Sequence, residues 1–391
     1  MDSRYPPGMS SLSTSTLCLG VLAIAGSVVA QQPPARVVVK RQVVEVSKES
    51  ALAVDAAVER GLAWLASQQN VKGFWEGIVG TKTQSRYEQL QPIELQRSKG
   101  TGHVGVTALC GMAFLSGGHL PGRGKYGKVV RKAVDAVLMS IRDDGIITLA
   151  GTQMYSHAFA TLFLAEVYGM SRDNTIKKGL ERAVHIVVDC QNAKGGWRYT
   201  PFSREADVSV TVCQLQALRA ARNIGIQVPK SVVERAVAYV KGCRVTSGWS
   251  SKGRYYYDSG GRGRKKNSYS IQAAAVTSLV SAGVYDRELI EPAMGFLADE
   301  LPTMIRRYPH HFFFWYGNYY ASQAFYHADH GLKDGCFQEY YVTMRDHLLD
   351  DQEKDGRWLN PRREGPGDAF GTAVACIILQ IPNQYLPIFQ R

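Results

Sequence analysis

Six polar residues stand near the starts of apolar helical segments, one in each segment: His103, His157, Asp207, Asn267, Asn318 and Asp368. The two histidines and two aspartates each precede a threonine by four residues, so they share one register along the chain. Histidine and aspartate serve as general acids and bases when their side chains converge on one cavity. We therefore take His103, His157, Asp207 and Asp368 as candidate catalytic residues.

Each of these residues also has a simpler explanation. Aspartate and asparagine at a helix start commonly cap the first turn by accepting hydrogen bonds from backbone N–H groups, which would account for Asp207, Asn267, Asn318 and Asp368. Histidine is a poor cap, so His103 and His157 are the stronger functional candidates. A metal site built from His103, His157 and Asp207 is a further alternative. Our prediction is that the chain holds no metal and no cofactor.

Aromatic residues are concentrated in one segment, with ten of them in residues 308–327. If the later ones line a cavity, that cavity is apolar and suits a lipid, or a cation held against the ring faces. Packing in the core is the simpler role for most of them. The residues that we predict to line a ligand are Asn267, Asn318, Trp315, Tyr319, Tyr320 and Tyr326.

A basic segment lies at residues 252–266, where six Lys and Arg side chains stand against one Asp. It can bind an anion such as a diphosphate or an acidic lipid head group, or it can be a solvated insertion. Both interpretations stay open. The chain has a net charge of +12, but no nucleic-acid recognition motif accompanies that charge, so we predict no nucleic-acid partner.

A repeated turn must position these residues. Glutamine and tryptophan recur at one spacing, with glycine between them, in three pairs: Gln69 and Trp75, Gln191 and Trp197, and Gln352 and Trp358. Each copy ends an amphipathic helical pattern, and glycine is the residue that stops a helix. A weaker copy ends in Gly248 and Trp249, and another keeps only residues 143–145. Such self-similarity predicts a repeat architecture.

The order helix, Gln, Gly, Trp resembles the QW motif of the prenyltransferase and squalene-oxidase repeat, which occurs in triterpene cyclases and in the beta subunits of protein prenyltransferases. The resemblance covers nearly all of the chain after about residue 50. It implies that the Gln and Trp residues are structural, and that they stack and tie one helix to the next. The resemblance predicts a fold and leaves the activity open.

Six pairs of helical segments follow residue 49. The first member of each pair has a charged side, as at Lys177, Lys178 and Glu181, and the second is rich in Ala, Gly, Thr and Val. Charged helices belong outside and small-residue helices inside. Together with the resemblance, this predicts an all-α fold, an (α/α)6 toroid of inner helices enclosed by outer ones. If the inner helices run parallel, the six polar residues lie around one mouth of the barrel.

The N-terminal residues predict export. Residues 17–30 form an apolar run that is too short to span a bilayer and ends in small residues, so we expect a signal peptide over residues 1–30, cleaved after Ala30. An uncleaved anchor is the alternative. Residues 31–48 are expected to be an extended linker and residues 49–391 the toroid. The prediction is a periplasmic or extracellular protein with no integral membrane span after cleavage.

The catalytic motifs that the resemblance would bring are missing. The Asp-x-Asp-Asp motif of cyclases that protonate an alkene and the Asp-Asp-x-x-Asp motif that binds magnesium and diphosphate match neither aspartate pair, 143–144 or 350–351. Asp334 and Cys336 resemble part of the prenyltransferase zinc site, but the later histidine is absent from the inner segment where it is expected.

We therefore expect an exported repeat protein that binds an apolar, isoprenoid-like ligand or a polypeptide in its central cavity. The alternative is an enzyme with a non-standard site at the polar mouth. It would be an isoprenoid cyclase or transferase, or a carbohydrate-active enzyme, since (α/α)6 barrels also serve glycan chemistry. If the four candidate catalytic side chains accept hydrogen bonds from backbone N–H groups, the binding interpretation is favoured over the enzyme interpretation.

Overall fold

The computed structural model describes residues 47–77, 102–149, 153–248, 252–260, 268–329, 335–360 and 366–390. Twelve α-helices and no strand lie in these residues. All the helices belong to one compact unit, Gln42–Arg391. The predicted signal peptide, like most of the predicted linker, falls outside the described residues. No helix in the described ranges is long and apolar enough to cross a membrane.

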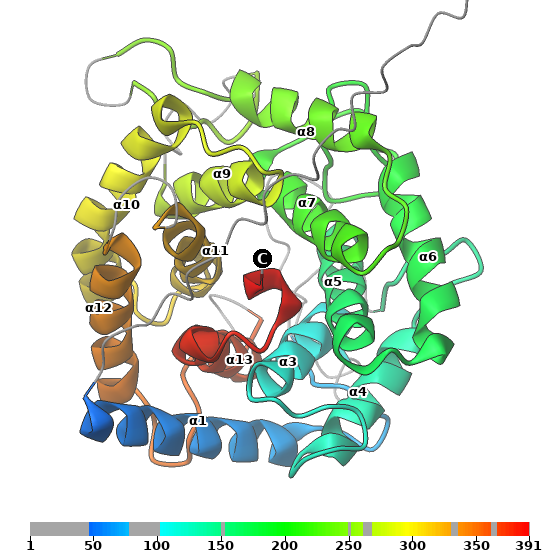
Figure 1. Cartoon of the computed structure of the whole chain (residues 1–391), viewed down its shortest axis with the longest axis vertical. Helices are drawn as coiled ribbons and strands as arrows, with labels where there is room; N and C mark the ends of the chain where they lie inside the picture. Colours follow the sequence, from blue (N-terminus) through cyan, green and yellow to red (C-terminus); the bar gives the residue numbers. More distant parts are fainter. Residues whose placement is uncertain are drawn as a thin grey trace, which may run out of the picture. The chain divides into compact units, whose positions relative to one another are not determined.

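Six helices form a closed inner ring (Figure 1): α3 (Val104–Ser116), α5 (Met154–Ser171), α7 (Val208–Asn223), α9 (Tyr269–Ser281), α11 (Phe312–Ala328) and α13 (Asp368–Gln380). Each packs against the next, and α13 packs back against α3. Every residue of α3 is buried. These helices are rich in small residues because their neighbours come close: a Cβ at Gly105 would lie 3.0 Å from Ser156 Oγ of α5.

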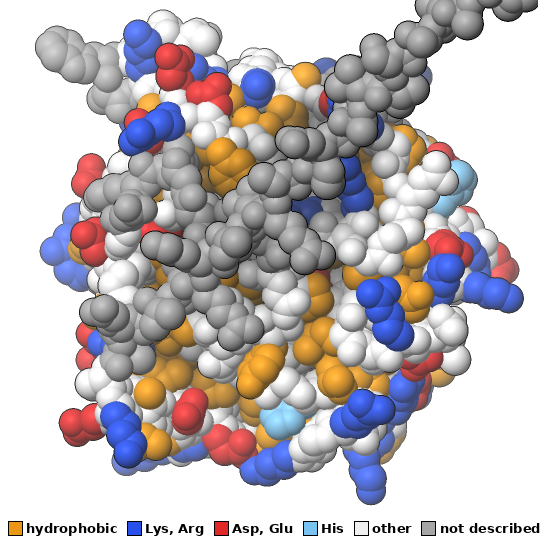
Figure 2. Space-filling view, in the orientation of Figure 1, with side chains coloured by type: hydrophobic (Ala, Val, Ile, Leu, Met, Phe, Trp, Pro, Cys, Tyr) orange, Lys and Arg blue, Asp and Glu red, His pale blue; other side chains and the backbone are white. Residues whose placement is uncertain are grey.

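The other six helices enclose this ring: α1 (Lys48–Gln68), α4 (Gly127–Met139), α6 (Asn174–Asp189), α8 (Lys230–Gly242), α10 (Arg287–Arg307) and α12 (Cys336–Asp350). Each is amphipathic. In α6, Ile176, Leu180 and Val187 recur at helical spacing and are buried, whereas Lys177 and Lys178 are exposed. On the side shown in Figure 2, the described charged side chains lie mainly around the edge, with hydrophobic side chains between them. The predicted α/α toroid is confirmed.

The inner helices run parallel. At one end of the barrel, Phe312 of α11 stacks on Phe370 of α13, and both residues lie at the starts of their helices. At the opposite end, Gln380 of α13 donates to the carbonyl oxygen of Ala113 (3.0 Å), near the end of α3. We call these ends the N-terminal mouth and the C-terminal mouth of the barrel.

The Gln residues of the repeated turns fasten each outer helix to the next one. Gln69 Nε2 donates to Gly73 O of its own turn (3.1 Å) and to Val129 O of α4 (3.0 Å). Gln191 and Gln352 make the same pair of bonds, reaching α8 and α1 respectively. The turn after α12 therefore closes the outer layer onto the first helix.

The Trp residues of these turns hold the inner helices. Trp197 Nε1 donates to Val187 O (2.8 Å), ten residues earlier in α6. Its backbone N–H donates to Thr211 Oγ1 of α7 (3.3 Å). Trp75 and Trp358 repeat both bonds. The threonines that share a register in the sequence are therefore acceptors for the turns, and each turn locks one outer helix to one inner helix.

The fourth repeat uses a tyrosine at this position. Gly253 has a φ of +86°, and Tyr255 is fully buried. The backbone N–H of Tyr255 donates to Gln272 Oε1 of α9 (2.9 Å), and its hydroxyl donates to Leu289 O of α10 (2.7 Å). Sequence analysis placed this turn at Gly248 and Trp249. The structure gives the role to Tyr255, and Trp249 lies outside the described residues.

Candidate functional site at the N-terminal mouth

His103 is the N-cap of α3. Its Nδ1 accepts a hydrogen bond from the backbone N–H of Val106 (3.1 Å). The ring is buried, and Nε2 has no hydrogen-bond partner among the described residues. Burial lowers the pKa of His103 to about 4. The ring is therefore neutral near neutral pH, and although histidine is a poor cap by type, it caps this helix.

His157 lies one turn inside α5 and is fully buried. Its Nδ1 accepts from the backbone N–H of Ile147 (3.0 Å), so Nε2 carries the proton and donates to Ala183 O of α6 (3.0 Å). Burial lowers the pKa of His157 to about 4. Ile147 occupies the position that Trp occupies in the other turns. Its backbone N–H therefore donates to His157, whereas the N–H of each Trp donates to a threonine. Both ring nitrogens are bound to backbone, which leaves neither available to a metal ion.

Asp207 is the N-cap of α7 and is fully buried. Its Oδ1 accepts from the backbone N–H of Val210 (2.8 Å) and from Ser209 Oγ (2.5 Å). Its Oδ2 accepts from Arg198 Nη1 at 2.6 Å. Asp207 is thus both a helix cap and one half of a buried ion pair, and a charge-assisted bond of this kind is stronger than a neutral one.

Arg198 gathers a cluster of tyrosines around the ion pair. Its guanidinium carbon lies 4.4 Å from the ring centroid of Tyr199 and 5.5 Å from that of Tyr257. Nη1 also donates to the Tyr257 hydroxyl (3.1 Å), which is hydrogen-bonded to the Tyr199 hydroxyl. Burial, followed by the charge of Asp207, raises the pKa of both tyrosines above their usual range. Both hydroxyls therefore stay protonated.

Two further tyrosines join this cluster from the inner helices. Tyr155 of α5 donates its hydroxyl proton to Ser209 Oγ (2.8 Å). Tyr316 of α11 donates to the backbone oxygen of Ser209 (2.7 Å), and its ring meets that of Tyr155 edge-on. The Arg198–Asp207 pair and these four tyrosines form the mouth network. No sequence pattern predicted this network, although Arg198 and Tyr199 directly follow Trp197.

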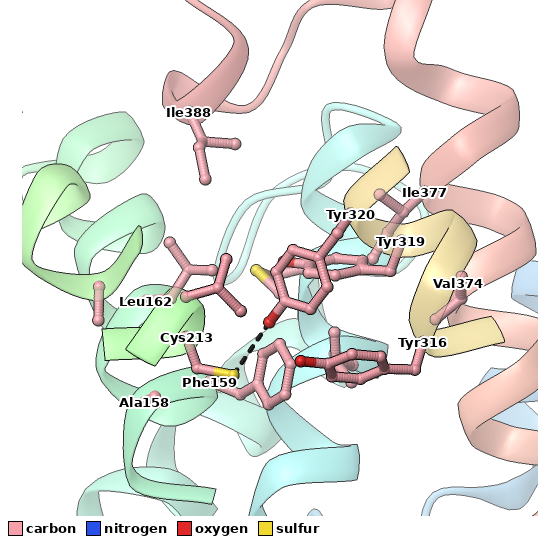
Figure 3. Close-up of a cluster of buried hydrophobic side chains, with 14 of the residues drawn as sticks. Ala158, Phe159, Leu162, Cys213, Tyr316, Tyr319, Tyr320, Val374, Ile377 and Ile388 are labelled. Atoms are coloured by element: carbon pink, nitrogen blue, oxygen red, sulfur yellow. Dashed lines mark hydrogen bonds between the residues drawn. The ribbon is translucent and has the colours of Figure 1, made fainter. Parts of the chain in front are cut away.

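An aromatic row continues from the mouth network into the barrel. On α11, Phe312 contacts Tyr316 (ring centroids 5.4 Å apart), and Tyr316 contacts Tyr320 edge-on (4.9 Å). Tyr319 meets Phe159 of α5 at 5.7 Å. Figure 3 shows the rings of Tyr316, Tyr319, Tyr320 and Phe159 in one buried cluster with side chains from α5, α7 and α13. Phe312 is partly exposed, whereas Tyr316, Tyr319 and Tyr320 are buried.

The residues predicted to line a ligand fall in different places. Tyr319 and Tyr320 belong to the aromatic row. Trp315 Nε1 donates to Leu359 O, in the segment between α12 and α13 (3.0 Å), and Tyr326 lies toward the C-terminal mouth. Asn318 is two turns inside α11, because that helix begins at Phe312, and its Oδ1 accepts from hydroxyls of α9 and α12. Asn267 lies outside the described residues.

Asp368 occupies the first turn of α13, where Gly367 is the N-cap. Its Oδ1 accepts from the backbone N–H of Asn360 (2.8 Å), and its Oδ2 lies 3.6 Å from Arg357 Nε. The side chain is 28% exposed. Asp368 therefore secures the segment that leads into α13.

No group of three His, Cys, Asp or Glu side chains in the described ranges could hold a metal ion. In the basic segment, residues 261–266 are outside these ranges. Arg254 lies over the ring of Phe296 at 4.5 Å, so the beginning of that segment is part of the barrel wall.

No protein-family model and no curated protein sequence matches the chain. Among solved structures, it is similar to a cellobiose 2-epimerase from Spirochaeta thermophila, with 14% identity and a TM-score of 0.59 over 86% of this chain and 97% of that one. An inactive variant of an alpha-1,6-mannanase of Salegentibacter, in complex with alpha-1,6-mannotriose, has 9% identity and a TM-score of 0.59 over 86% and 99%. A variant of a type II terpene cyclase from Scytonema has 12% identity and a TM-score of 0.54 over 88% and 100%.

These likenesses define the class of fold. The chain is an α/α toroid, the architecture that it shares with a terpene cyclase and with two carbohydrate-active enzymes. The expected likeness to the terpenoid cyclase toroid is thereby confirmed as a likeness of fold.

Proposed function

We propose that the protein is a binding protein that holds an apolar, isoprenoid-like ligand at the N-terminal mouth of its inner barrel. The observation that carries this proposal is the aromatic row, which runs from the partly exposed Phe312 past Tyr316 to the buried Tyr319 and Tyr320. Aromatic rings bury large apolar areas and offer their faces to alkyl and cationic groups. A chain of isoprenoid character would lie along this row.

The mouth network supplies a polar end for such a ligand. Arg198 keeps 14% of its side chain exposed, and Tyr155 and Tyr257 are also partly exposed. Their hydroxyl groups are neutral and lie beside an ion pair, and their oxygens can accept a hydrogen bond from a ligand with one hydroxyl head group. Ligand sites commonly combine apolar walls with a few fixed polar groups in this way.

The geometry of the four candidate catalytic residues favours binding over catalysis. His103, His157, Asp207 and Asp368 each accept a hydrogen bond from a backbone N–H group. Catalysis would require at least two of them to present free atoms to one cavity. An enzyme acting on isoprenoids or carbohydrates therefore remains the second candidate, supported only by the kinds of protein that share the fold. A polypeptide is the alternative ligand class.

We also propose that this binding takes place outside the cytoplasm, because residues 1–30 have the pattern of a signal peptide. N-terminal sequencing of the mature protein tests this directly. A mature chain that begins at Gln31 is the expected result, and a mature chain that retains residues 1–30 would contradict export with cleavage.

The test of the ligand is native mass spectrometry of the purified protein, with extraction and identification of any lipid that it carries. The matched variants are Phe312→Ala, in the aromatic row, and Phe313→Ala, its neighbour on α11, which is 50% exposed. Phe312→Ala should lower occupancy by an isoprenoid alcohol such as farnesol by about tenfold, since one buried ring is worth about 1.5 kcal/mol or more. Phe313→Ala should leave occupancy unchanged. Equal occupancy in the two variants would exclude the aromatic row as the site.

A further inference from the structure

The C-terminal mouth of the barrel is covered by the end of the chain. After α13, two single turns of 3-10 helix follow, η1 (Ile381–Asn383) and η2 (Pro387–Phe389). η2 packs against α5 and α7. Figure 1 shows the C-terminus at the centre of the inner ring. We call residues 385–390 the tail.

Three tail side chains are inserted into the barrel: Leu386, Ile388 and Phe389, which are 2%, 3% and 4% exposed. Ile388 points from η2 toward the buried cluster that contains Leu162 and Tyr320 (Figure 3). The ring of Phe389 stacks on His327 of α11, with centroids 6.4 Å apart. Tyr326 donates its hydroxyl proton to Phe389 O (2.9 Å). The tail therefore occupies this mouth as a bound peptide would.

Glu166 of α5 lies beneath the tail and is 1% exposed. Its Oε2 accepts a hydrogen bond from the backbone N–H of Ile388 (3.1 Å). Its Oε1 is buried and has no hydrogen-bond partner in the described part of the chain. Buried polar atoms are nearly always paired, so the tail leaves one polar atom of this site without a hydrogen bond. A peptide that supplied one more polar group would satisfy the site better than the tail does.

Hydrogen bonds between residues of the tail hold much of its conformation. Within it, the backbone N–H groups of Phe389 and Gln390 donate to Leu386 O and Pro387 O, and Gln390 Nε2 donates to Tyr385 O (3.1 Å). It is joined to α13 through Gln384, a non-glycine residue with a φ of +53°, which is a costly conformation. Tyr385 is 49% exposed. Short turns held by a few local backbone hydrogen bonds open at a lower free energy than long packed helices do.

We propose that the C-terminal mouth is a binding site for a short apolar peptide, and that the chain's own tail fills it as a releasable stopper. Release of the tail uncovers Glu166 and opens the aromatic interior at this end. The proposal does not depend on which ligand the N-terminal mouth holds, because the contacts that carry it lie on η2, α5 and the end of α11.

The test uses a shortened protein that ends at Gln384 and a fluorescent peptide of residues 385–390. The shortened protein should bind this peptide, and the full-length protein should bind it at least about tenfold more weakly, because its own tail competes for the site. The matched control is the same peptide with Ile388→Asp, which should bind at least about tenfold more weakly to the shortened protein. Fluorescence anisotropy measures all three affinities.

Two results would overturn the proposal. One is a shortened protein that keeps its helical circular dichroism and fails to bind the peptide. The other is equal binding by the shortened and full-length proteins, which would place the peptide elsewhere. If shortening abolishes folding, the full-length Ile388→Asp variant is the second measurement. This variant should fold and should bind the peptide of residues 385–390 more tightly than the unaltered full-length protein does. A variant that fails to fold would show that the tail is an integral part of the core.

Discussion

Gln352 Nε2 donates a hydrogen bond to the carbonyl oxygen of Ala57 in α1 at 2.9 Å, although the two residues are 295 positions apart. The same amide nitrogen donates to Gly356 O in its own turn (2.8 Å). The turn after the last outer helix is thereby fastened to the first one. An open array of repeats needs capping repeats at its ends, whereas this closed ring protects its ends by joining them.

Replacement of Gln352 should therefore weaken the whole ring. Gln352→Ala leaves the carbonyl oxygens of Ala57 and Gly356 without this donor, which should lower the free energy of unfolding by about 1–3 kcal/mol. The measurement is urea unfolding followed by circular dichroism. Gln68→Ala is the control, because Gln68 is exposed in α1, and it should change stability by less than about 0.5 kcal/mol. Equal effects of the two variants would contradict a special role for the closing bond.

The glycines of the turns should tolerate no side chain. Gly195 has a φ of +89°, and a Cβ there would lie 2.4 Å from Arg235 O of α8. Gly225 has a similar φ of +92° but open space around it. Gly225→Ala should cost about 1 kcal/mol, from backbone strain alone. Gly195→Ala should cost at least about 2 kcal/mol more, because α8 must move. Thermal unfolding of the two variants measures the difference, and equal melting temperatures would contradict the close approach.

The toroid could be predicted because its signals are local and repeated. Gln69, Gln191 and Gln352 precede Trp at one spacing, and in the structure all three make the same two hydrogen bonds. The fourth repeat departs from the pattern. Its aromatic residue is Tyr255, whose backbone N–H donates to Gln272 of α9 where the other turns use a threonine. A pattern search cannot find a position whose function has moved to another residue type.

The mouth network could not be predicted, because it depends on which loops meet in space. Arg198 contacts Tyr257, which is 59 residues away, through a loop that no periodic pattern describes. Asp207 was found by its register, but its ion pair with Arg198 was not. The tail was also missed, because single 3-10 turns leave no periodicity in the sequence. The acid and base interpretation of His103, His157, Asp207 and Asp368 stays a prediction.

The ion pair of the mouth network should be sensitive to the loss of one partner. Arg198→Met leaves the carboxylate of Asp207 buried without its cation, which should cost about 3–5 kcal/mol. In the double variant Arg198→Met/Asp207→Asn, no charge is buried, and the asparagine oxygen can still accept from the N–H of Val210. The double variant should therefore be more stable than Arg198→Met alone. Urea unfolding of the two single variants and the double variant completes the cycle, and a double variant that is less stable would contradict the argument.

Acid should destabilise the fold through His103 and His157. Burial lowers the pKa of each from 6.5 to about 4, so the folded state holds them neutral while the unfolded state takes up protons. Their contribution to the free energy of unfolding is complete above pH 6.5. It is lost as the pH falls toward 4, by about 1.4 kcal/mol per pH unit for each histidine. His103→Asn, which keeps the cap, should reduce the slope of stability against pH between pH 6 and 4.5 by about 1 kcal/mol per pH unit. An unchanged slope in His103→Asn would exclude His103 as a source.

A rise in pH should weaken the binding of the tail through Glu166. The effect of this residue on stability has the opposite sign to that of His103 and His157. Burial raises the pKa of this carboxyl from 4.5 to about 8, against the lowering effects of the N–H of Ile388 and of Arg219 on α7. Tyr319 of α11, the other titratable group facing it, has its pKa raised by burial and stays neutral. The folded state therefore binds a proton that the unfolded state releases, so this stabilisation is complete below pH 4.5 and is lost as the pH rises through 8.

Glu166→Gln isolates this effect, because glutamine offers an oxygen to the N–H of Ile388 but does not titrate. The free energy of unfolding of the wild-type protein minus that of the variant should fall by about 1–3 kcal/mol from pH 5.5 to pH 8. Subtraction of the variant removes the contributions of the histidines, which act in the same measurements below pH 6.5. The peptide of residues 385–390 should likewise bind the shortened protein more weakly as the pH rises. A difference that stays constant with pH would mean that Arg219 holds Glu166 ionised in the fold, and the stopper would then respond to competing peptide but not to pH.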